Sequence, residues 1–316
     1  MTSTVMNRRA ALGLMFALVA CEGAQDMLSR AELNSDASAR GLALVRARGT
    51  SIVVIPFDSP DFYLRSEPGV ELTGFGKAGT VISWSGDPLR GRREFLIATT
   101  GGTTITSAHE TGKSFGVTAL SESAKRLTYL SPPSLTRRGP GLSWTSFDFS
   151  QGGFVDNSDG DNPQGDWSHD GRFVAYEKAG SVYSFDTENG LTKRLVAGHD
   201  PSWSPTGNYI SYRTPNGRVA LITPEGQSVN WPPGQHLTVS AIRWSPTGKY
   251  VAFVEARPFH IPLIGSYYRL VVCRVSDGKG VAVREFGPGS PDLQGFYWIV
   301  DYRDFCAKCT HGAPFN

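Results

Sequence analysis

The stretch WSPTGNYISY, residues 203–212, recurs with few changes as WSPTGKYVAF, residues 244–253. The proline in each copy fixes its own φ near −65°, which suits the second position of a type I turn, and the glycine two residues later accepts the positive φ that closes such a loop. After the glycine, apolar residues fall on both faces of an extended strand. The phrase therefore predicts a strand, a tight hairpin and a second strand that is covered on both sides.

Three weaker copies of the phrase occur earlier in the chain. WSHDGRFVAY begins at 167, LSESAKRLTYL begins at 120 without the Trp and the Gly, and WSGDPLRGRREFLIA begins at 84 with a longer loop. The starts are separated by 36, 47, 36 and 41 residues. The residues expected to build the repeats are Trp84, Leu120, Trp167, Gly171, Trp203, Gly207, Trp244 and Gly248.

A period of about 40 residues with several strands per unit is typical of a β-propeller. Further turn signals, such as Asn189-Gly190 and Asp277-Gly278, divide each unit into four antiparallel strands. One four-stranded sheet leaves both faces exposed, so the copies must stack face to face around a ring. At about 42 residues per blade, residues 51–316 predict an all-β propeller of six blades, with seven left open. The sixth blade would combine residues 51–57 with residues 295–302.

The repeated phrase resembles the Trp-Ser-Pro-Asp-Gly repeats of TolB-type propellers, over about residues 80–290. Thr206 and Thr247 replace the usual Asp, so the resemblance is at the level of the superfamily. It implies a propeller that binds a protein or peptide of the cell envelope. The stretch GSVYSFDTENG, residues 180–190, is also similar to the outer-membrane assembly propeller BamB.

The first twenty residues resemble an export signal. Arg8 and Arg9 precede an apolar stretch, residues 10–20, which is too short to cross a hydrocarbon core of about 30 Å. The signal ends in Leu18-Val19-Ala20-Cys21, which resembles the bacterial lipobox and implies lipidation of Cys21. An ordinary cleaved signal is the alternative. We expect a signal peptide over 1–20, a lipidated N-terminus and tether over 21–50, and the propeller over 51–316.

Charge and composition limit the partners. The net charge is +2, and removal of residues 1–20 leaves equal numbers of acidic and basic residues. Without a basic run, nucleic acid is not an expected partner. In the lipoproteins that the lipobox resembles, aspartate after the cysteine is what retains a protein in the inner membrane, so Glu22 implies the outer membrane in a cell with two membranes. We expect a monomeric protein that faces the periplasm or the cell exterior.

Three candidate catalytic or metal sites can be named, and they do not form one set. Ser114 lies in GKSFG, which matches the G-x-S-x-G pattern of hydrolases but lacks the strand before it and the helix after it. The loop DNSDGDN, residues 156–162, is rich in oxygen ligands but misses the EF-hand spacing, so a solvated turn is favoured over a calcium site. His199 precedes a blade start and has no second histidine at ligand spacing.

The cysteines point to a disulfide. Cys306 and Cys309 form a C-x-x-C pair near the C-terminus, and export to an oxidising compartment favours a bond there. Cys273 lies in an apolar strand and is the expected odd, buried thiol.

The sequence thus predicts a non-catalytic, membrane-anchored envelope lipoprotein whose propeller binds a protein or peptide, with no cofactor, no metal and no catalytic residue. One alternative is a propeller enzyme, a metal-assisted lyase or a glycan hydrolase, with its site in the central channel. The other is a BamB-like outer-membrane assembly factor.

Overall fold

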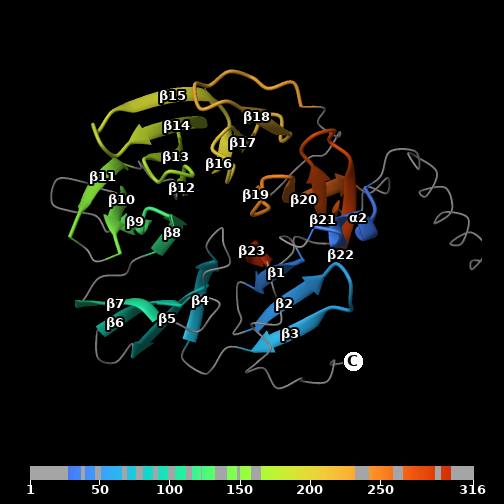
Figure 1. Cartoon of the computed structure of the whole chain (residues 1–316), viewed down its shortest axis with the longest axis horizontal. Helices are drawn as coiled ribbons and strands as arrows, with labels where there is room; N and C mark the ends of the chain where they lie inside the picture. Colours follow the sequence, from blue (N-terminus) through green and yellow to red (C-terminus); the bar gives the residue numbers. More distant parts are fainter. Residues whose placement is uncertain are drawn as a thin grey trace, which may run out of the picture.

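The computed structural model places all of its described strands in antiparallel sheets arranged around one axis (Figure 1). It describes residues 28–36, 40–46, 51–65, 70–75, 81–87, 92–98, 104–111, 116–121, 123–131, 141–147, 150–157, 165–231, 242–258, 266–288 and 293–299. Within these residues the strands form six sheets, five with four strands and one with three.

The six sheets follow one another along the chain, except that the last strand joins the first three. The joined sheet has the order β23 (Leu293–Ile299), β1 (Gly41–Arg46), β2 (Ser51–Pro56) and β3 (Phe62–Arg65). The second has β4 (Val70–Phe75), β5 (Val81–Asp87), β6 (Arg92–Ala98) and β7 (Thr104–Thr111). The third has β8 (Gly116–Ser121), β9 (Arg126–Ser131), β10 (Gly141–Ser146) and β11 (Gly152–Asn157).

The remaining three sheets contain the clear copies of the repeated phrase. The fourth has β12 (Gly165–Trp167), β13 (Phe173–Lys178), β14 (Ser181–Asp186) and β15 (Thr192–Ala197). The fifth has β16 (His199–Trp203), β17 (Ile210–Arg213) and β18 (Val219–Ile222), with one further bridge from Ile222 to Ser228. The sixth has β19 (Arg243–Trp244), β20 (Tyr250–Pro258), β21 (Ser266–Arg274) and β22 (Gly280–Pro288). We call these blades 1 to 6, beginning with the joined sheet.

The first strand of each sheet lines the axis. In ring order β4 contacts β8, β8 contacts β12, β12 contacts β16, β16 contacts β19, β19 contacts β23, and β23 contacts β4 (Figure 1). This closed circle confirms the predicted all-β propeller and gives it six blades.

The ring is closed by pairing the two ends of the chain. β23 is the inner strand of blade 1 and pairs antiparallel with β1, from Gly41 opposite Ile299 to Arg46 opposite Leu293. The predicted use of residues 51–57 and 295–302 in one blade is therefore correct. The predicted boundary at residue 51 is wrong, because β1 belongs to the propeller.

The segment before β1 also packs on the propeller. Helix α2 (Arg30–Asn34) follows the capping residue Ser29, whose hydroxyl accepts from the backbone N–H of Glu32 at 3.1 Å. Leu28 and Leu33 are each 1% exposed and belong to the core cluster between blades 1 and 6. The tether expected over 21–50 therefore ends at Leu28 at the latest.

Trp84 does not stand where the sequence predicted. It lies in β5, the second strand of blade 2, whereas Leu120, Trp167, Trp203 and Trp244 lie in inner strands. A Trp-Ser pair is compatible with any antiparallel hairpin. It therefore does not distinguish the first hairpin of a blade from the second.

The serine of the repeated phrase fixes each inner hairpin. The hydroxyls of Ser168, Ser204 and Ser245 accept from the backbone N–H five residues on, at 2.9, 3.1 and 3.0 Å. Their carbonyls accept from the backbone N–H groups of the turn glycines, which have φ of +69° to +77°. The three copies of the phrase recur because they make the same turn.

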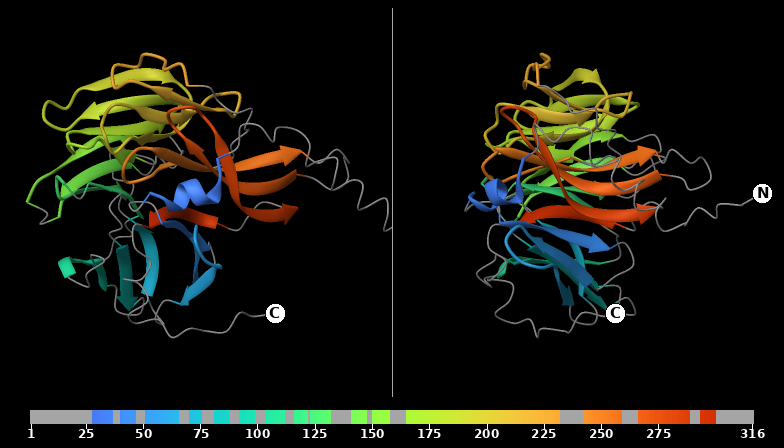
Figure 2. Two further views of the ribbon diagram at one scale, coloured as in Figure 1. Left: turned by 45° about the vertical axis from the view of Figure 1, so that its right-hand side comes forward. Right: turned by 90° about the vertical axis from the view of Figure 1, so that its right-hand side faces the viewer.

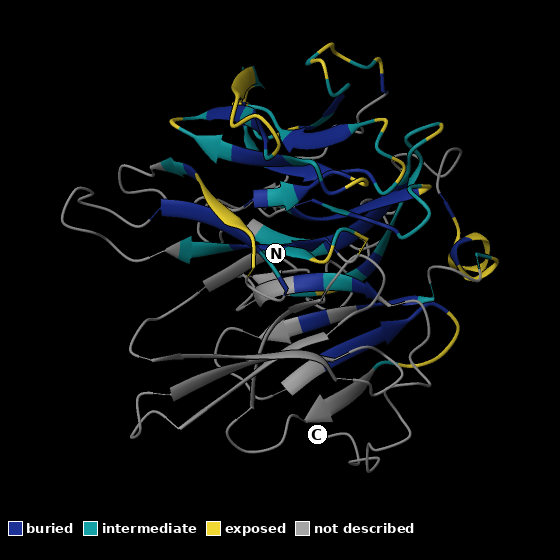
Figure 3. Ribbon diagram, turned by 60° about the vertical axis from the view of Figure 1, so that its left-hand side comes forward, coloured by how far each residue is buried: buried dark blue, intermediate teal, exposed yellow. Residues whose placement is uncertain are grey.

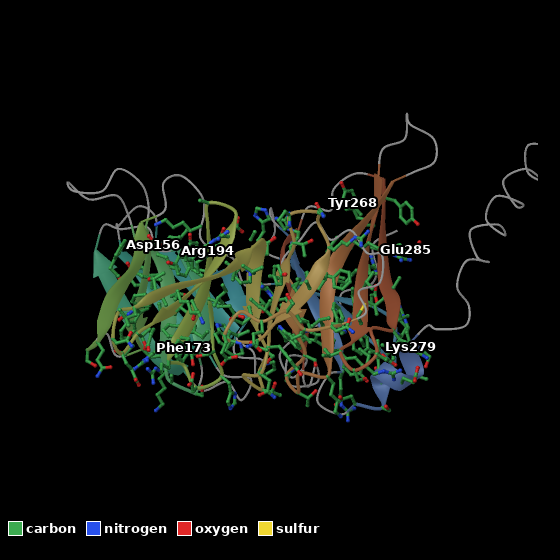
Figure 4. The ribbon with its side chains drawn as sticks, turned by 90° about the horizontal axis from the view of Figure 1, so that it is seen from above. Asp156, Phe173, Arg194, Tyr268, Lys279 and Glu285 are labelled. Atoms are coloured by element: carbon green, nitrogen blue, oxygen red, sulfur yellow. The ribbon has the colours of Figure 1, made fainter. Side chains whose placement is uncertain are left out.

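These turns lie on one face of the disc, the lower face in Figure 4, where Phe173 and Lys279 are labelled. The upper face carries the starts of the inner strands and is marked in Figure 4 by Asp156, Arg194 and Tyr268. α2 lies at the lower face, since Glu32 contacts Arg274 and Asp36 contacts Lys249 beside the turns of blade 6. Figure 2 shows α2 at one face and the far end of β20 at the other.

Apolar side chains fill the seams between blades, and Figure 3 shows the buried positions concentrated along the strands. Two tryptophans also form hydrogen bonds between neighbouring blades. Trp244 Nε1 donates to Ser202 O of blade 5 at 3.0 Å, and Trp298 Nε1 donates to Arg243 O of blade 6 at 3.0 Å. Trp298 therefore takes in blade 1 the place that Trp244 takes in blade 6. The repeated phrase does not mark Trp298, because the strand paired with β23 is β1, from the other end of the chain.

Candidate functional site

On the lower face the turns of neighbouring blades pack tightly around the axis. Most of the predicted repeat residues lie in or beside these turns. A Cβ at Gly171 would lie 2.1 Å from Ala124 Cβ, and one at Gly248 would lie 3.2 Å from Thr206 Cγ2. Ser123 Oγ donates to His169 O in the next turn at 2.8 Å. Successive turns thus touch one another, and Gly171, Gly207 and Gly248 stand at these contacts as structural residues.

Several predicted sites fall outside the described residues. They are Cys21, Ser114, Cys306, Cys309 and residues 158–162. Asp156, the first residue of the oxygen-rich loop, is described and is already engaged at the seam between blades 3 and 4. Its carboxylate accepts from Tyr176 Oη and from Lys178 Nζ, each at 2.7 Å. Burial and the Asp156 hydrogen bond both raise the pKa of the Tyr176 phenol, so it stays a neutral donor.

Cys273 is a free thiol in β21 and is 1% exposed. Burial, followed by the charge of Glu255, raises its pKa to about 12. Because the thiolate is the reactive species, we expect Cys273 to resist thiol reagents at pH 8 in the folded protein and to react after unfolding. Thiol titration of a Cys306→Ser, Cys309→Ser variant, with and without denaturant, measures this. Rapid reaction of Cys273 in the native protein would contradict the packing of blade 6.

A polar cluster lies on the upper face at the seam between blades 4 and 5. We call it the seam cluster: Glu177 at the end of β13, His199 and Asp200 at the start of β16, and Arg213 at the end of β17. His199 Nδ1 lies 2.6 Å from Glu177 Oε1, and the backbone N–H of Asp200 donates to Glu177 Oε2 at 3.1 Å. Arg213 Nε donates to Asp200 Oδ2 at 2.8 Å. Both carboxylates are thereby held by partners within the cluster.

The backbone around the seam cluster is tightly specified. Asp200 has φ of +51°, which is uncommon for a residue with a side chain. A Cβ at Gly198 would lie 2.5 Å from Tyr212 Cδ2 and 2.7 Å from Arg213 O. Residues held in sparsely populated conformations need support from their surroundings and often mark functional positions.

The seam cluster has polar groups that make no hydrogen bond to the described residues. His199 and Arg213 are cross-strand partners, and about 30% of each side chain is exposed. Toward the described residues, His199 Nε2 and the two terminal nitrogens of Arg213 make no hydrogen bond. Arg194, exposed on β15 of blade 4, uses only its Nε within the described part of the chain, toward Ser181 Oγ. The site can therefore offer donors to a ligand without breaking its own bonds.

The sequence pattern predicts His199 as a candidate but not Glu177, Asp200 or Arg213. A signal was present in the repeats. The residue directly after the repeated phrase is Glu177 in one copy, Arg213 in the next and Val254 in the last. Positions that differ while the phrase around them repeats are not needed for the blade itself.

The described residues were compared with the requirements of a metal site and of a membrane-spanning helix. No three His, Cys, Asp or Glu side chains among them come together as metal ligands. No helix among them has the length and apolar character to cross a membrane.

No family model matches the chain, and no curated protein matches it. Among solved structures it is similar to TolB from Acinetobacter baumannii, with a TM-score of 0.55, 17% identity, and coverage of 82% of this chain and 65% of that one. This chain thus spans slightly less than two thirds of that protein. A putative TolB from Agrobacterium tumefaciens has a TM-score of 0.53, 14% identity, and coverage of 83% and 99%.

A puromycin hydrolase structure gives a TM-score of 0.46 at 17% identity, over 80% of this chain and 46% of that one, which is too low to carry weight. Both TolB structures match more than four fifths of this chain. This chain therefore has the fold of the TolB-type β-propellers.

Proposed function

We propose that this protein is a non-catalytic, lipid-anchored propeller of the cell envelope that binds a protein or peptide partner on its upper face. The observation that carries the proposal is the seam cluster. Its carboxylates are bonded internally, while the terminal nitrogens of Arg213 have no acceptor and His199 Nε2 makes no hydrogen bond among the described residues.

Donors without acceptors favour a partner that brings acceptors. Arg213 suits a carboxylate, because two of its guanidinium N–H groups can bond the two oxygens together. Arg194 suits backbone carbonyls or further carboxylates, and His199 Nε2, with Nδ1 donating to Glu177, can accept from an N–H or hydroxyl of the partner. The partner segment is therefore an exposed peptide with at least one acidic side chain or a free C-terminal carboxylate.

The lower face is the less suitable binding surface. Its turns touch one another through Gly171 and Gly248, and their serines are bonded to the backbone of the same turn. Groups that are already paired offer a ligand little net gain.

Binding on the upper face is tested by photo-crosslinking in intact cells from residue 216, which is exposed in the upper loop of blade 5. We expect one captured species in the parent chain, and at least a tenfold loss of capture in Arg213→Ala and His199→Ala. Asn208→Ala is the matched control, because Asn208 is exposed in the lower loop of the same blade. Capture that survives both upper-face substitutions, or that Asn208→Ala also abolishes, would contradict the proposal.

The anchor rests on the lipobox-like Leu18-Val19-Ala20-Cys21. We expect Cys21→Ala to move the protein from the membrane fraction to the soluble fraction, or to leave an uncleaved precursor without lipid. Mass spectrometry of the N-terminal peptide distinguishes these states. Membrane association of a cleaved Cys21→Ala chain would contradict lipidation at this residue.

The His199–Glu177 pair is also the described feature that best fits the alternative of a channel enzyme. A carboxylate that orients an imidazole is the arrangement a general base requires. A stoichiometric, tightly bound transition metal in the purified protein, lost in His199→Ala, would favour the enzyme over the binding protein.

A further inference from the structure

The N-terminal attachment of the chain fixes which face of the propeller a membrane can approach. The inference rests on the proposed lipid anchor at Cys21, and it deepens the proposed function by stating the direction from which a partner must come. We propose that α2 clamps the lower face toward the membrane, so that the seam cluster on the upper face points away from it.

The first step is the shortness of the free chain. Leu28 is already in the core between blades 1 and 6, at 1% exposure. Six residues, 22–27, separate it from Cys21. Whatever their conformation, the covalent reach from Cys21 to Leu28 is at most about 25 Å, at ~3.6 Å per residue.

The second step is that α2 holds this attachment in place. Leu33 is buried in the same cluster as Leu28, and burial of a leucine side chain contributes about 1.5–3 kcal/mol. Arg30 donates to the carbonyl of Val283 in β22, and Glu32 contacts Arg274 at 3.4 Å. The hydrogen bonds from Ser29, and to a smaller extent the contact with Arg274, lower the pKa of Glu32, so these contacts persist at neutral pH.

The third step compares the tether with the height of the disc. α2 lies at the lower edge of blade 6, beside Lys249 and Arg274. From there β21, at nine residues and about 3.3 Å per residue, rises roughly 27–30 Å to the upper face. A tether of about 25 Å cannot pass the full height of blade 6, so the upper face cannot lie flat on the membrane that holds Cys21.

Two consequences follow for the partner. It meets the seam cluster from the aqueous side and cannot be a segment buried in the same leaflet as the anchor. Release of α2 would add the chain between Leu28 and β1 to the tether and would remove the constraint.

The test measures the heights of two matched positions above a vesicle. Asn208 and Asn216 are both exposed in blade 5, on the lower and the upper face respectively. Each is replaced by cysteine in the lipidated protein carrying Cys306→Ser and Cys309→Ser, labelled with one donor dye, and bound to phosphatidylglycerol–phosphatidylethanolamine vesicles that contain a headgroup acceptor dye. We expect energy transfer at least twofold greater from position 208 than from position 216.

A second pair of variants tests the clamp itself. With Leu28→Ser and Leu33→Ser added, we expect the ratio between the two positions to fall toward one while the protein stays on the vesicles. Equal transfer from both positions in the otherwise unchanged lipidated protein, or greater transfer from 216, would overturn the orientation and leave the anchor intact. A protein that carries no lipid at Cys21 would instead overturn the anchor, and the orientation with it.

Discussion

Replacing Gly171 by alanine is expected to lower the free energy of unfolding by about 3 kcal/mol or more. Two costs combine at this position. Gly171 has φ of +69°, where an L-residue pays roughly 1–2 kcal/mol. A Cβ there would also lie 2.1 Å from Ala124 Cβ and 2.8 Å from Ser121 Oγ, so the turns of blades 3 and 4 must separate, and such overpacking costs about 1–3 kcal/mol.

Gly190→Ala is the matched control. Gly190 has nearly the same φ, +71°, in an outer turn of blade 4, and a Cβ there would meet nothing within 4 Å. We expect this variant to lose only the backbone cost, about 1 kcal/mol. Urea unfolding of both variants measures the difference. Equal losses would mean that the turns of neighbouring blades do not touch on the lower face.

Arg269→Met is expected to destabilise the fold by about 3–5 kcal/mol, because it removes the guanidinium that pairs with a buried carboxylate. Glu255 and Arg269 are directly opposite each other on β20 and β21, and their side chains form an ion pair. Glu255 is only 2% exposed, so water cannot replace the guanidinium. The loss should appear as a lower urea midpoint.

The double variant Glu255→Leu, Arg269→Met separates charge from packing. With the carboxylate also removed, no buried charge is left unpaired, and we expect most of the lost stability to return. A double variant that is no more stable than Arg269→Met alone would show that packing of the arginine stem, rather than its charge, supports blade 6.

The sequence predicts the blades well because each repeated phrase contains all the residues that form its turn. Ser245 and Gly248 close a turn with backbone groups only a few residues away, so the motif and the structure coincide. The same locality explains the error at Trp84. A hairpin motif identifies a hairpin but does not say which two strands of a blade it joins.

The sequence does not predict contacts between residues that are far apart along the chain. β1 reads as part of a polar tether because its partner β23 comes from the other end of the chain. The seam cluster gathers Glu177, His199 and Arg213 from three strands of two blades, and no spacing along one strand indicates this. Only the variation of the residue after each phrase hints at it.

The closure of the ring by β1 and β23 is the claim on which the faces, the seam cluster and the orientation all depend. Ala43 and Tyr297 are opposite each other in this pairing. Antiparallel partners have Cα atoms about 4.5–5.5 Å apart, within the range a disulfide spans. In a chain with Cys306→Ser and Cys309→Ser, we expect Ala43→Cys and Tyr297→Cys to form a bond on mild oxidation, seen as one linked peptide by non-reducing mass spectrometry. Full alkylation of both thiols in the folded, oxidised protein would contradict the closed ring.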